Sequence, residues 1–360
     1  MGRPTLIILQ QVLGRNIACT QASCFFFFIH TMNIYFNRLK AYIPKSLLFL
    51  AVVAATTFTF TSCSEEEHPW DNLNPPGGNT GGSTGGSTSN SANTQITSRM
   101  ETPRVLNDGT TLLISHDVSI NGKKVNNYML EYDITKYHSR WVAFRFDGDT
   151  RKQYTGRSDE PFTDDPSLSS TYHIGSRGFG SGYDRGHLCA SADRVFSTTA
   201  NEQTFYMTNM SPQKSSFNQG YWVTLEGLVQ QCGRNASFAD TLYVVKGGTI
   251  KNDQIMNYIT RSNGKKVAVP KYYYMALLKV KNNAYSSIGF WMEHKEYGYD
   301  YKNKAPLSEI AKHAVTINKL EELTGMDFFP NLPDAAEEKI ESRCNPSEWG
   351  AQRSEERRVG

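Results

Sequence analysis

The residues best suited to chemistry lie between Gly182 and Glu226. The run Asp184-Arg185-Gly186-His187 joins a carboxylate, a guanidinium and an imidazole, and amides follow at Asn209 and Asn218. Cleaving a phosphodiester requires a base that takes a proton from water, positive charge beside the phosphate, and stabilisation of the leaving oxygen. An imidazole, an arginine and a cation bound through oxygen can meet these needs. The stretch therefore indicates phosphate chemistry.

His187 is the predicted general base. Imidazole can be neutral near pH 7 and accept a proton, and Gly186 lets the backbone pass close to a substrate or metal. A lone histidine is more often structural. Here Asn218 follows 31 residues later as its complement, which favours the catalytic interpretation. Asp184 is expected to orient the structure rather than react.

Asn218 is the predicted metal ligand, because Mg²⁺ prefers oxygen, keeps most of its water and needs few protein ligands. The alternative is that Asn218 caps a helix. Glu226 lies eight residues later, just over two helical turns, so both side chains can face the same side. The Glu226 carboxylate could hydrogen-bond the water around the metal; the alternative is a solvated helix charge.

The pattern Asn-Gln-Gly-x-Trp-x-x-Leu-Glu at 218–226, together with Asp-Arg-Gly-His at 184–187, resembles the DNA/RNA non-specific endonuclease family, which includes endonuclease G. The resemblance spans roughly residues 100–335 and includes the closing segment TINKLEELTGMDFFPNLP. It implies an α+β fold, with a central antiparallel sheet, packed helices and a ββα-metal active-site motif. It also implies Mg²⁺ or Mn²⁺ as cofactor, and DNA and RNA as substrates.

The same resemblance implies roles for single residues. His187 corresponds to the general base of the family and Asn218 to its metal ligand. Asn209 matches a position beside the histidine whose amide helps hold the site, although asparagine before a turn with proline is also ordinary turn chemistry. Arg185 could contact phosphate through its planar fork. Arg157 is the nearest match to an upstream arginine, at a longer distance from Asp-Pro than is usual in the family.

Several segments must position these side chains. Segments with strand-like composition lie at 111–118, 128–134, 140–146, 241–245, 272–280 and 286–292. Residues 148–182 are polar and rich in Gly, Ser and Asp, and predict a long surface loop. Residues 316–323 predict a short amphipathic helix that stops at Gly325.

Composition places these segments in one globular domain at 96–345. With 39% hydrophobic residues, the middle of the 360-residue chain can build a sizeable core. A net charge of +3 permits a nucleic-acid binder without identifying one. Only Cys189, Cys232 and Cys344 fall in this domain, without CxxC spacing, which argues against a zinc site. Export would permit one disulfide among them, of undetermined pairing.

Residues 32–63 predict a secretory signal, with basic residues, an apolar stretch at 47–60 and then small residues. The ending Thr61-Ser62-Cys63 resembles a relaxed lipobox. We therefore expect an exported protein held on the outer membrane by a lipid on Cys63. The acidic residues after it resemble tags for cell-surface exposure. The alternative is an uncleaved signal anchor. Residues 1–31 are interpreted as a mis-assigned extension before a start at Met32.

The flanks of the domain have a composition unsuited to a core. Residues 64–95 predict a Gly/Ser-rich linker that would hold the domain off the membrane. Residues 346–360 are interpreted as a tail. Its last part, 353–360, has no apolar face and resembles a translated sequencing adapter, with a genuine charged tail as the alternative.

Three functions fit these observations. The first is a Mg²⁺-dependent endonuclease that cuts DNA and RNA without strong sequence preference, through contacts to phosphate and sugar. The second is a catalytically silent, surface-tethered nucleic-acid-binding lipoprotein on the same scaffold. The third is a phosphodiesterase acting on smaller substrates. The intact His187 and Asn218 speak against the second, and the polar loop at 148–182 does not exclude the third. The sequence does not fix an oligomeric state.

Overall fold

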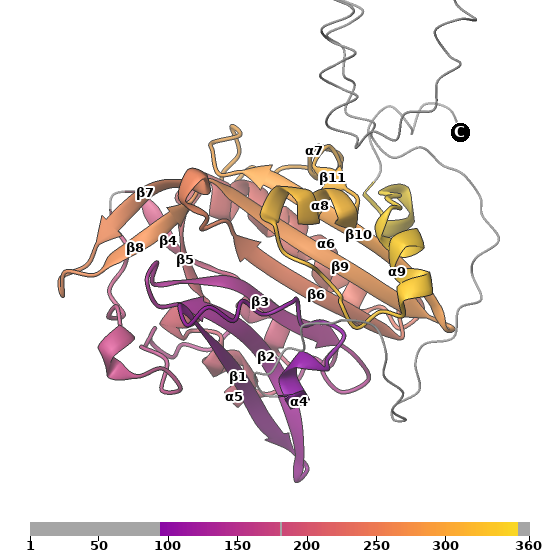
Figure 1. Cartoon of the computed structure of the whole chain (residues 1–360), viewed down its shortest axis with the longest axis horizontal. Helices are drawn as coiled ribbons and strands as arrows, with labels where there is room; N and C mark the ends of the chain where they lie inside the picture. The colour runs from indigo at the N-terminus through magenta and orange to yellow at the C-terminus, as the bar shows by residue number, and fades with distance from the viewer. Residues whose placement is uncertain (1–93, 181, 352–360) are drawn as a thin grey trace, which may run out of the picture. The chain divides into compact units, whose positions relative to one another are not determined.

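The computed structural model of the chain describes residues 94–180 and 182–351 (Figure 1). The proposed secretory signal with Cys63, the linker as far as residue 93, and residues 353–360 lie outside this range, so the interpretations of those segments stay predictions. Within the described residues, no helix is both long and apolar enough to cross a membrane.

Seven strands form a central antiparallel sheet in the order β1-β2-β3-β6-β9-β10-β11. They are β1 (Thr111–Ile120), β2 (Lys123–Asp133), β3 (His138–Phe146), β6 (Thr241–Gly248), β9 (Tyr272–Lys281), β10 (Ala284–Glu293) and β11 (Ala314–Val315). Each of the first six overlaps one of the six predicted strands; the largest difference is at β2, which begins five residues before the predicted 128–134 and ends at Asp133. The predicted α+β class with a central antiparallel sheet is therefore confirmed.

Both faces of this sheet are buried. Along β3, Val142 and Phe144 enter one hydrophobic core, whereas Trp141 and Ala143 enter another. The first core includes α6 (Val223–Arg234) and α7 (Leu307–Ala311), and the second includes α8 (Ile317–Thr324) and α9 (Asp334–Glu341). Figure 1 shows α8 and α9 lying over one face of the sheet. Because neighbouring side chains of β3 enter opposite cores, the sequence of this strand is almost entirely apolar over these residues.

The remaining elements are short. They are α4 (Thr94–Thr97), α5 (Thr198–Gln203), β4 (Tyr183–His187), β5 (Met210–Lys214), β7 (Ile255–Thr260), β8 (Lys266–Pro270), the π-helix η4 (Phe217–Trp222) and the 3₁₀ helices η1 (Ser170–Tyr172), η2 (Ser191–Arg194), η3 (Met207–Asn209), η5 (Asn252–Gln254) and η6 (Ser347–Trp349). The predicted helix at 316–323 is α8. The Thr316 hydroxyl accepts from the Lys319 N–H at its start, and Gly325 ends it at φ 67°.

The polar loop at 148–182 contains one short 3₁₀ helix and is held against the sheet by buried side chains. Asp165 is 1% exposed, and its carboxylate accepts from the Thr208 hydroxyl at 2.5 Å and contacts Nε2 of His116 at 3.0 Å. Arg261 donates to four carbonyls of the loop, those of Ile174, Gly175, Arg177 and Gly178. The loop therefore has a fixed position beside η3, which leads into β5.

Two glycines of α6 give a matched test of how closely this helix packs on the sheet. A Cβ at Gly233 would overlap the ring of Phe146 in β3, whereas a Cβ at Gly227 would meet nothing within 4 Å. Overpacking should make Gly233→Ala less stable by about 1–3 kcal/mol. The better helix propensity of alanine should make Gly227→Ala more stable, by up to about 1 kcal/mol. Thermal unfolding of both purified variants measures the difference. Equal shifts would mean that the contact with Phe146 is not tight.

Candidate active site

Two strands and a helix bring the candidate side chains together. β4 pairs antiparallel with β5, with Tyr183 opposite Lys214 and His187 opposite Met210. The chain then enters η4, which continues directly into α6. His187 ends β4, and Asn218 lies in the first turn of η4. This succession of two antiparallel strands and one helix is the predicted ββα arrangement.

Aromatic packing sets the position of η4. Phe217 and Trp222 stack at 5.8 Å between ring centroids, and Tyr221 stacks on Tyr297 at 3.9 Å. Gly220 lets the backbone of residues 299–300 pack closely on η4, because a Cβ at this position would overlap that backbone. Its carbonyl accepts from the Ala305 N–H at 2.7 Å. The loop at 294–306 therefore packs directly on the helix that bears Asn218.

Asp184 holds the amide of Asn218. Its Oδ2 accepts from Nδ2 of Asn218 at 2.9 Å and from the Gln219 side chain at 2.7 Å, and its Oδ1 accepts from the Ser215 hydroxyl at 2.8 Å. Asp184 thus orients its neighbours, as expected. Asn218 does not cap the helix, since it lies within η4 and its side chain bonds to β4. With Nδ2 committed to Asp184, the carbonyl Oδ1 is the end of the amide left to bind a cation.

Asn209 fixes the chain directly after His187. It is fully buried, its Oδ1 accepts from the Cys189 N–H at 2.8 Å, and its Nδ2 donates to the carbonyls of Cys189 and Thr204 at 2.8 and 2.7 Å. Its backbone carbonyl also accepts from the Leu188 N–H at 2.9 Å. Of the two interpretations, the geometry agrees with a side chain that helps hold the site.

His187 is half-buried between two phenylalanine rings, at centroid distances of 5.8 Å from Phe162 and 5.2 Å from Phe205. Its Nε2 is buried and has no hydrogen-bond partner among the described residues. Burial, followed by the positive charges of Arg157, Lys246 and Arg185, lowers the pKa of His187 to about 3. The imidazole is therefore neutral near pH 7 and able to accept a proton.

The same two rings carry the two candidate arginines. The guanidinium of Arg185 lies 3.7 Å from the centroid of Phe162 and donates to the Ser176 carbonyl at 2.6 Å. That of Arg157 lies 4.8 Å from the centroid of Phe205. The structure thus brings Arg157 to the site despite its longer spacing in the sequence. Sequence reasoning missed both phenylalanines, although single large aromatics in polar segments were an available signal.

Glu226 lies on α6 among buried charged groups. Burial raises its pKa to about 7, against the lowering effect of the Lys246 ammonium. Lys246 forms a fully buried ion pair of 2.6 Å with Asp193, whose other oxygen accepts from Gln230 at 3.1 Å. Within the described residues, no hydrogen bond joins Glu226 to Asn218. Lys246 was missed because a single lysine in an apolar strand carries no motif.

Two sequence expectations need correction. Gly186 was expected to allow a substrate or metal to approach, but a Cβ at this position would overlap the side chain of Gln213 in β5. Packing between the two strands is therefore the reason for glycine here. Cys189 and Cys232 are both free and buried, so no disulfide joins them.

The comparisons agree with this geometry. The family model for DNA/RNA non-specific endonucleases matches residues 109–335. The chain belongs to the DNA/RNA non-specific endonuclease family. It is 29% identical over 230 residues to a nuclease of a Nostoc species, covering 61% of this chain and 77% of that protein. It is 27% identical to the mouse mitochondrial nuclease EXOG, covering 58% of this chain and 57% of that protein.

A structural comparison matches a crystal structure of an EndoG/EndoGI complex. The match has a TM-score of 0.47 and 23% identity, and covers 61% of this chain and 88% of that chain. Membership of the family makes this protein a nuclease that hydrolyses phosphodiester bonds, which confirms the predicted class of enzyme.

The residues present fit a divalent cation held through oxygen. The Asn218 amide is turned by Asp184 so that its oxygen is free, which suits a Mg²⁺ or Mn²⁺ ion that keeps most of its water. In the part of the chain that the structure describes, no group of three or more His, Cys, Asp or Glu side chains is arranged to hold a metal. A cation at Asn218 would therefore depend on one protein oxygen, water and the substrate phosphate.

We expect Asn209→Ala to lower both stability and activity. Removing the amide leaves buried backbone groups at Cys189 and Thr204 without partners, which should lower the free energy of unfolding by roughly 2–4 kcal/mol. Asn257, exposed on β7, is the matched control, and Asn257→Ala should change stability by no more than about 0.5 kcal/mol. Chemical denaturation measures both variants. If both variants lower the free energy of unfolding by the same small amount, the hydrogen bonds of Asn209 do not stabilise the segment after His187.

Proposed function

We propose that this nuclease cleaves DNA and RNA with His187 as general base and a Mg²⁺ or Mn²⁺ ion at Asn218. The observation that carries the proposal is a neutral, half-buried imidazole grouped with two arginines, on the strand whose Asp184 holds the Asn218 amide. These groups match the three needs of phosphodiester hydrolysis: a proton acceptor, positive charge and stabilisation of the leaving oxygen.

His187 would take a proton from the attacking water. Nε2 is buried without a hydrogen-bond partner among the described residues, so in this proposal Nδ1 would be the nitrogen that accepts the proton. A pKa of about 3 makes the free imidazole a weak base, since a general base works best when its pKa lies near the operating pH. A bound phosphate would offset the charges of Arg157 and Arg185, which contribute to that low pKa. Substrate binding would therefore raise the basicity of His187.

Arg185 and Arg157 would bind the phosphate. Their guanidinium groups lie on the faces of Phe162 and Phe205, which restricts each to a small range of positions. The planar fork of arginine matches two phosphate oxygens at once. Phosphate contacts of this kind are the same for every base, which agrees with cleavage of both DNA and RNA.

Asn218 would hold the cation, with Glu226 acting through its water. A bound divalent ion would neutralise negative charge that develops on the phosphate and the leaving oxygen. Glu226, with a pKa of about 7, can accept a hydrogen bond from water as carboxylate or donate one as acid. Asp184 would orient the side-chain amide of Asn218 toward the cation and would not itself contact the substrate.

The other two functions are less well supported. A silent binding protein has no need of a neutral imidazole beside the phosphate-binding arginines. A phosphodiesterase for small substrates uses the same chemistry and differs only in the size of substrate. Incubating the purified protein with plasmid, RNA and a small phosphodiester, with and without EDTA, separates the three. Cleavage of the small phosphodiester alone would remove the nuclease proposal.

We expect His187→Ala to abolish cleavage while folding and DNA binding are kept. Loss of a positioned base should lower kcat by at least ~10²-fold, with no recovery when Mg²⁺ is raised. Single-turnover cleavage of a labelled oligonucleotide and circular dichroism of the same sample measure activity and folding together. A near wild-type rate in the purified variant would remove His187 from the mechanism.

We expect Asn218→Ala to damage metal use more than substrate binding. Cleavage should fall at ordinary Mg²⁺ and recover in part as Mg²⁺ is raised, because mass action offsets weaker binding. Glu226→Gln should lower activity about 10–100-fold, as is usual when a group that orients bound water is lost. Gln219→Ala is the control, since Gln219 also bonds to Asp184 but is exposed. If Asn218→Ala keeps the wild-type Mg²⁺ midpoint, Asn218 is not a ligand.

A further inference from the structure

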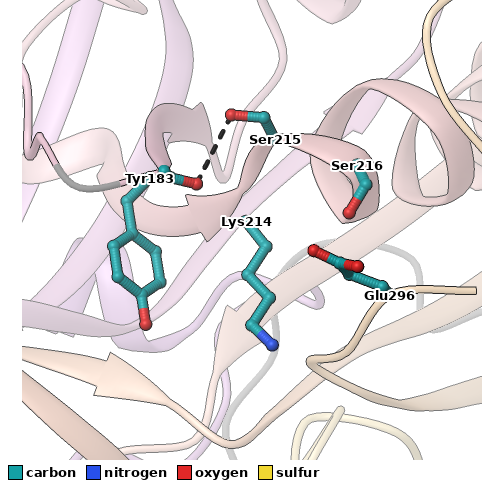
Figure 2. Close-up of a pocket in the computed structure, with 6 residues that line it drawn as sticks. Tyr183, Lys214, Ser215, Ser216 and Glu296 are labelled. Atoms are coloured by element: carbon teal, nitrogen blue, oxygen red, sulfur yellow. Dashed lines mark hydrogen bonds between the residues drawn. The ribbon is translucent and has the colours of Figure 1, made fainter.

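A cavity of about 430 Å³ lies beside the candidate metal ligand. Its walls are Gly182, Tyr183, Lys214, Ser215, Ser216 and Glu296, shown in Figure 2. Ser215 connects the cavity to the active site, since its hydroxyl donates to Asp184 at 2.8 Å, and Asp184 holds Asn218. The size falls within the usual range for small-molecule pockets, about 300–1,000 Å³.

One wall of the cavity is aromatic and firmly held. The ring of Tyr183 is half-exposed, and its centroid lies 6.2 Å from that of His294. Nε2 of His294 accepts from the Lys214 N–H at 2.7 Å, and Nδ1 lies 2.8 Å from the Pro270 carbonyl. His294 must therefore carry its proton on Nδ1, and it fixes the backbone of Lys214 opposite Tyr183. A flat ring could stack on Tyr183 without rearrangement of this wall.

Two charged side chains that line the cavity are not part of any ion pair among the residues that the structure describes. Within the described residues, neither the Lys214 ammonium nor the Glu296 carboxylate has an ion-pair partner, and the buried hydroxyl of Ser216 has no hydrogen-bond partner. Figure 2 shows the side chains of Lys214 and Glu296 on the same side of the cavity, with Glu296 near Ser216. Glu296 would repel a phosphate but can accept from N–H groups.

We propose that this cavity binds an unstacked nucleobase of the substrate, with a preference for bases that carry an exocyclic amino group. The base would stack on Tyr183, and its amino group would donate to Glu296. Adenine and cytosine present such a donor, whereas thymine presents a carbonyl in the same place. Lys214 would attract the adjoining phosphate. The inference rests on the proposed cleavage of nucleic acids and adds a subsite to it.

The position of the cavity fits a neighbouring nucleotide rather than the one being cleaved. Tyr183 precedes His187 by four residues on β4, which corresponds to roughly 13 Å at ~3.3 Å per residue. A base must leave its stack to enter a pocket of this kind, and the cost is smallest in single strands. The subsite should therefore act mainly on single-stranded substrates, where stacking on an aromatic side chain contributes to the affinity for each base.

Binding of cytosine-only and thymine-only single-stranded oligonucleotides tests the inference. The two pyrimidines differ at the position where one has an amino group and the other a carbonyl. Affinity is measured by fluorescence anisotropy with the full-length His187→Ala protein in Mg²⁺, so that cleavage does not interfere. We expect the cytosine oligonucleotide to bind about fivefold or more tightly than the thymine one. Glu296→Gln should remove most of this difference.

Two controls separate the subsite from general effects. Glu293→Gln removes the same charge from an exposed carboxylate that is paired with Lys295, and it should keep the preference. Tyr183→Ala should weaken binding of both oligonucleotides by about tenfold, whereas Tyr183→Phe, which keeps the ring, should not.

Three results would overturn the inference. They are equal affinity of the parent protein for both oligonucleotides, a preference that survives Glu296→Gln, and loss of the preference in Glu293→Gln. If the parent protein binds neither oligonucleotide, the proposed function fails as well. Equal binding of both oligonucleotides overturns the subsite alone.

Discussion

The set of hydrogen bonds to Asp184 joins the two halves of the active site. One carboxylate on β4 accepts from the side chains of Ser215, Asn218 and Gln219, all at the start of the helix. The strand that ends in the candidate base is thereby tied to the turn that carries the candidate metal ligand. Three hydrogen bonds to one carboxylate therefore hold the two halves of the site in a fixed relation.

Buried charge beneath the site is the second constraint. Lys246 and Asp193 form an ion pair with no solvent exposure, and Arg194 is equally buried against the rings of Phe144 and Phe146. Such groups contribute little net stability, because the loss of hydration offsets their attraction, but removing one partner leaves an uncompensated charge at high cost. Lys246 acts on both His187 and Glu226, whose pKa values it lowers. Burial is the larger influence on both pKa values, and the buried ammonium adds to it at His187 and opposes it at Glu226.

More of the central sheet than of the active-site geometry could be predicted from the sequence. The six long strands could be found because they contain apolar runs, as in β3, β6 and β9, or alternate apolar with polar residues, as in part of β1. α8 could be found because Thr316 and Gly325 mark its ends. β4 and β5 could not be predicted as strands, since Asp184-Arg185-Gly186-His187 and most of Met210–Lys214 are polar, and the two segments pair although they are far apart in sequence. Motif spacing identified the residues that the structure groups together. It could not show that Phe162 and Phe205, distant in sequence, form the surface on which those residues rest.

These two rings also explain how positive charge is kept available. Some other arginines of the described residues are held by carboxylates, as Arg99 is by Glu101 and Arg140 by Glu131. A carboxylate beside Arg157 or Arg185 would neutralise the charge that, in the proposed function, attracts phosphate. In the described residues no carboxylate forms an ion pair with either, and the face of a phenylalanine holds each instead. A cation–π contact restrains the guanidinium while leaving its charge uncompensated.

That arrangement has a consequence for the base. Burial lowers the pKa of His187, and the uncompensated guanidinium charges of Arg157 and Arg185 lower it further, so the imidazole is neutral in the free enzyme. A phosphate bound by these arginines, as proposed, would bring negative charge that favours an imidazolium. A bound phosphate would therefore make His187 a stronger base than it is in the empty site. The two phenylalanines would thus couple substrate binding to the strength of the base without touching the reacting atoms.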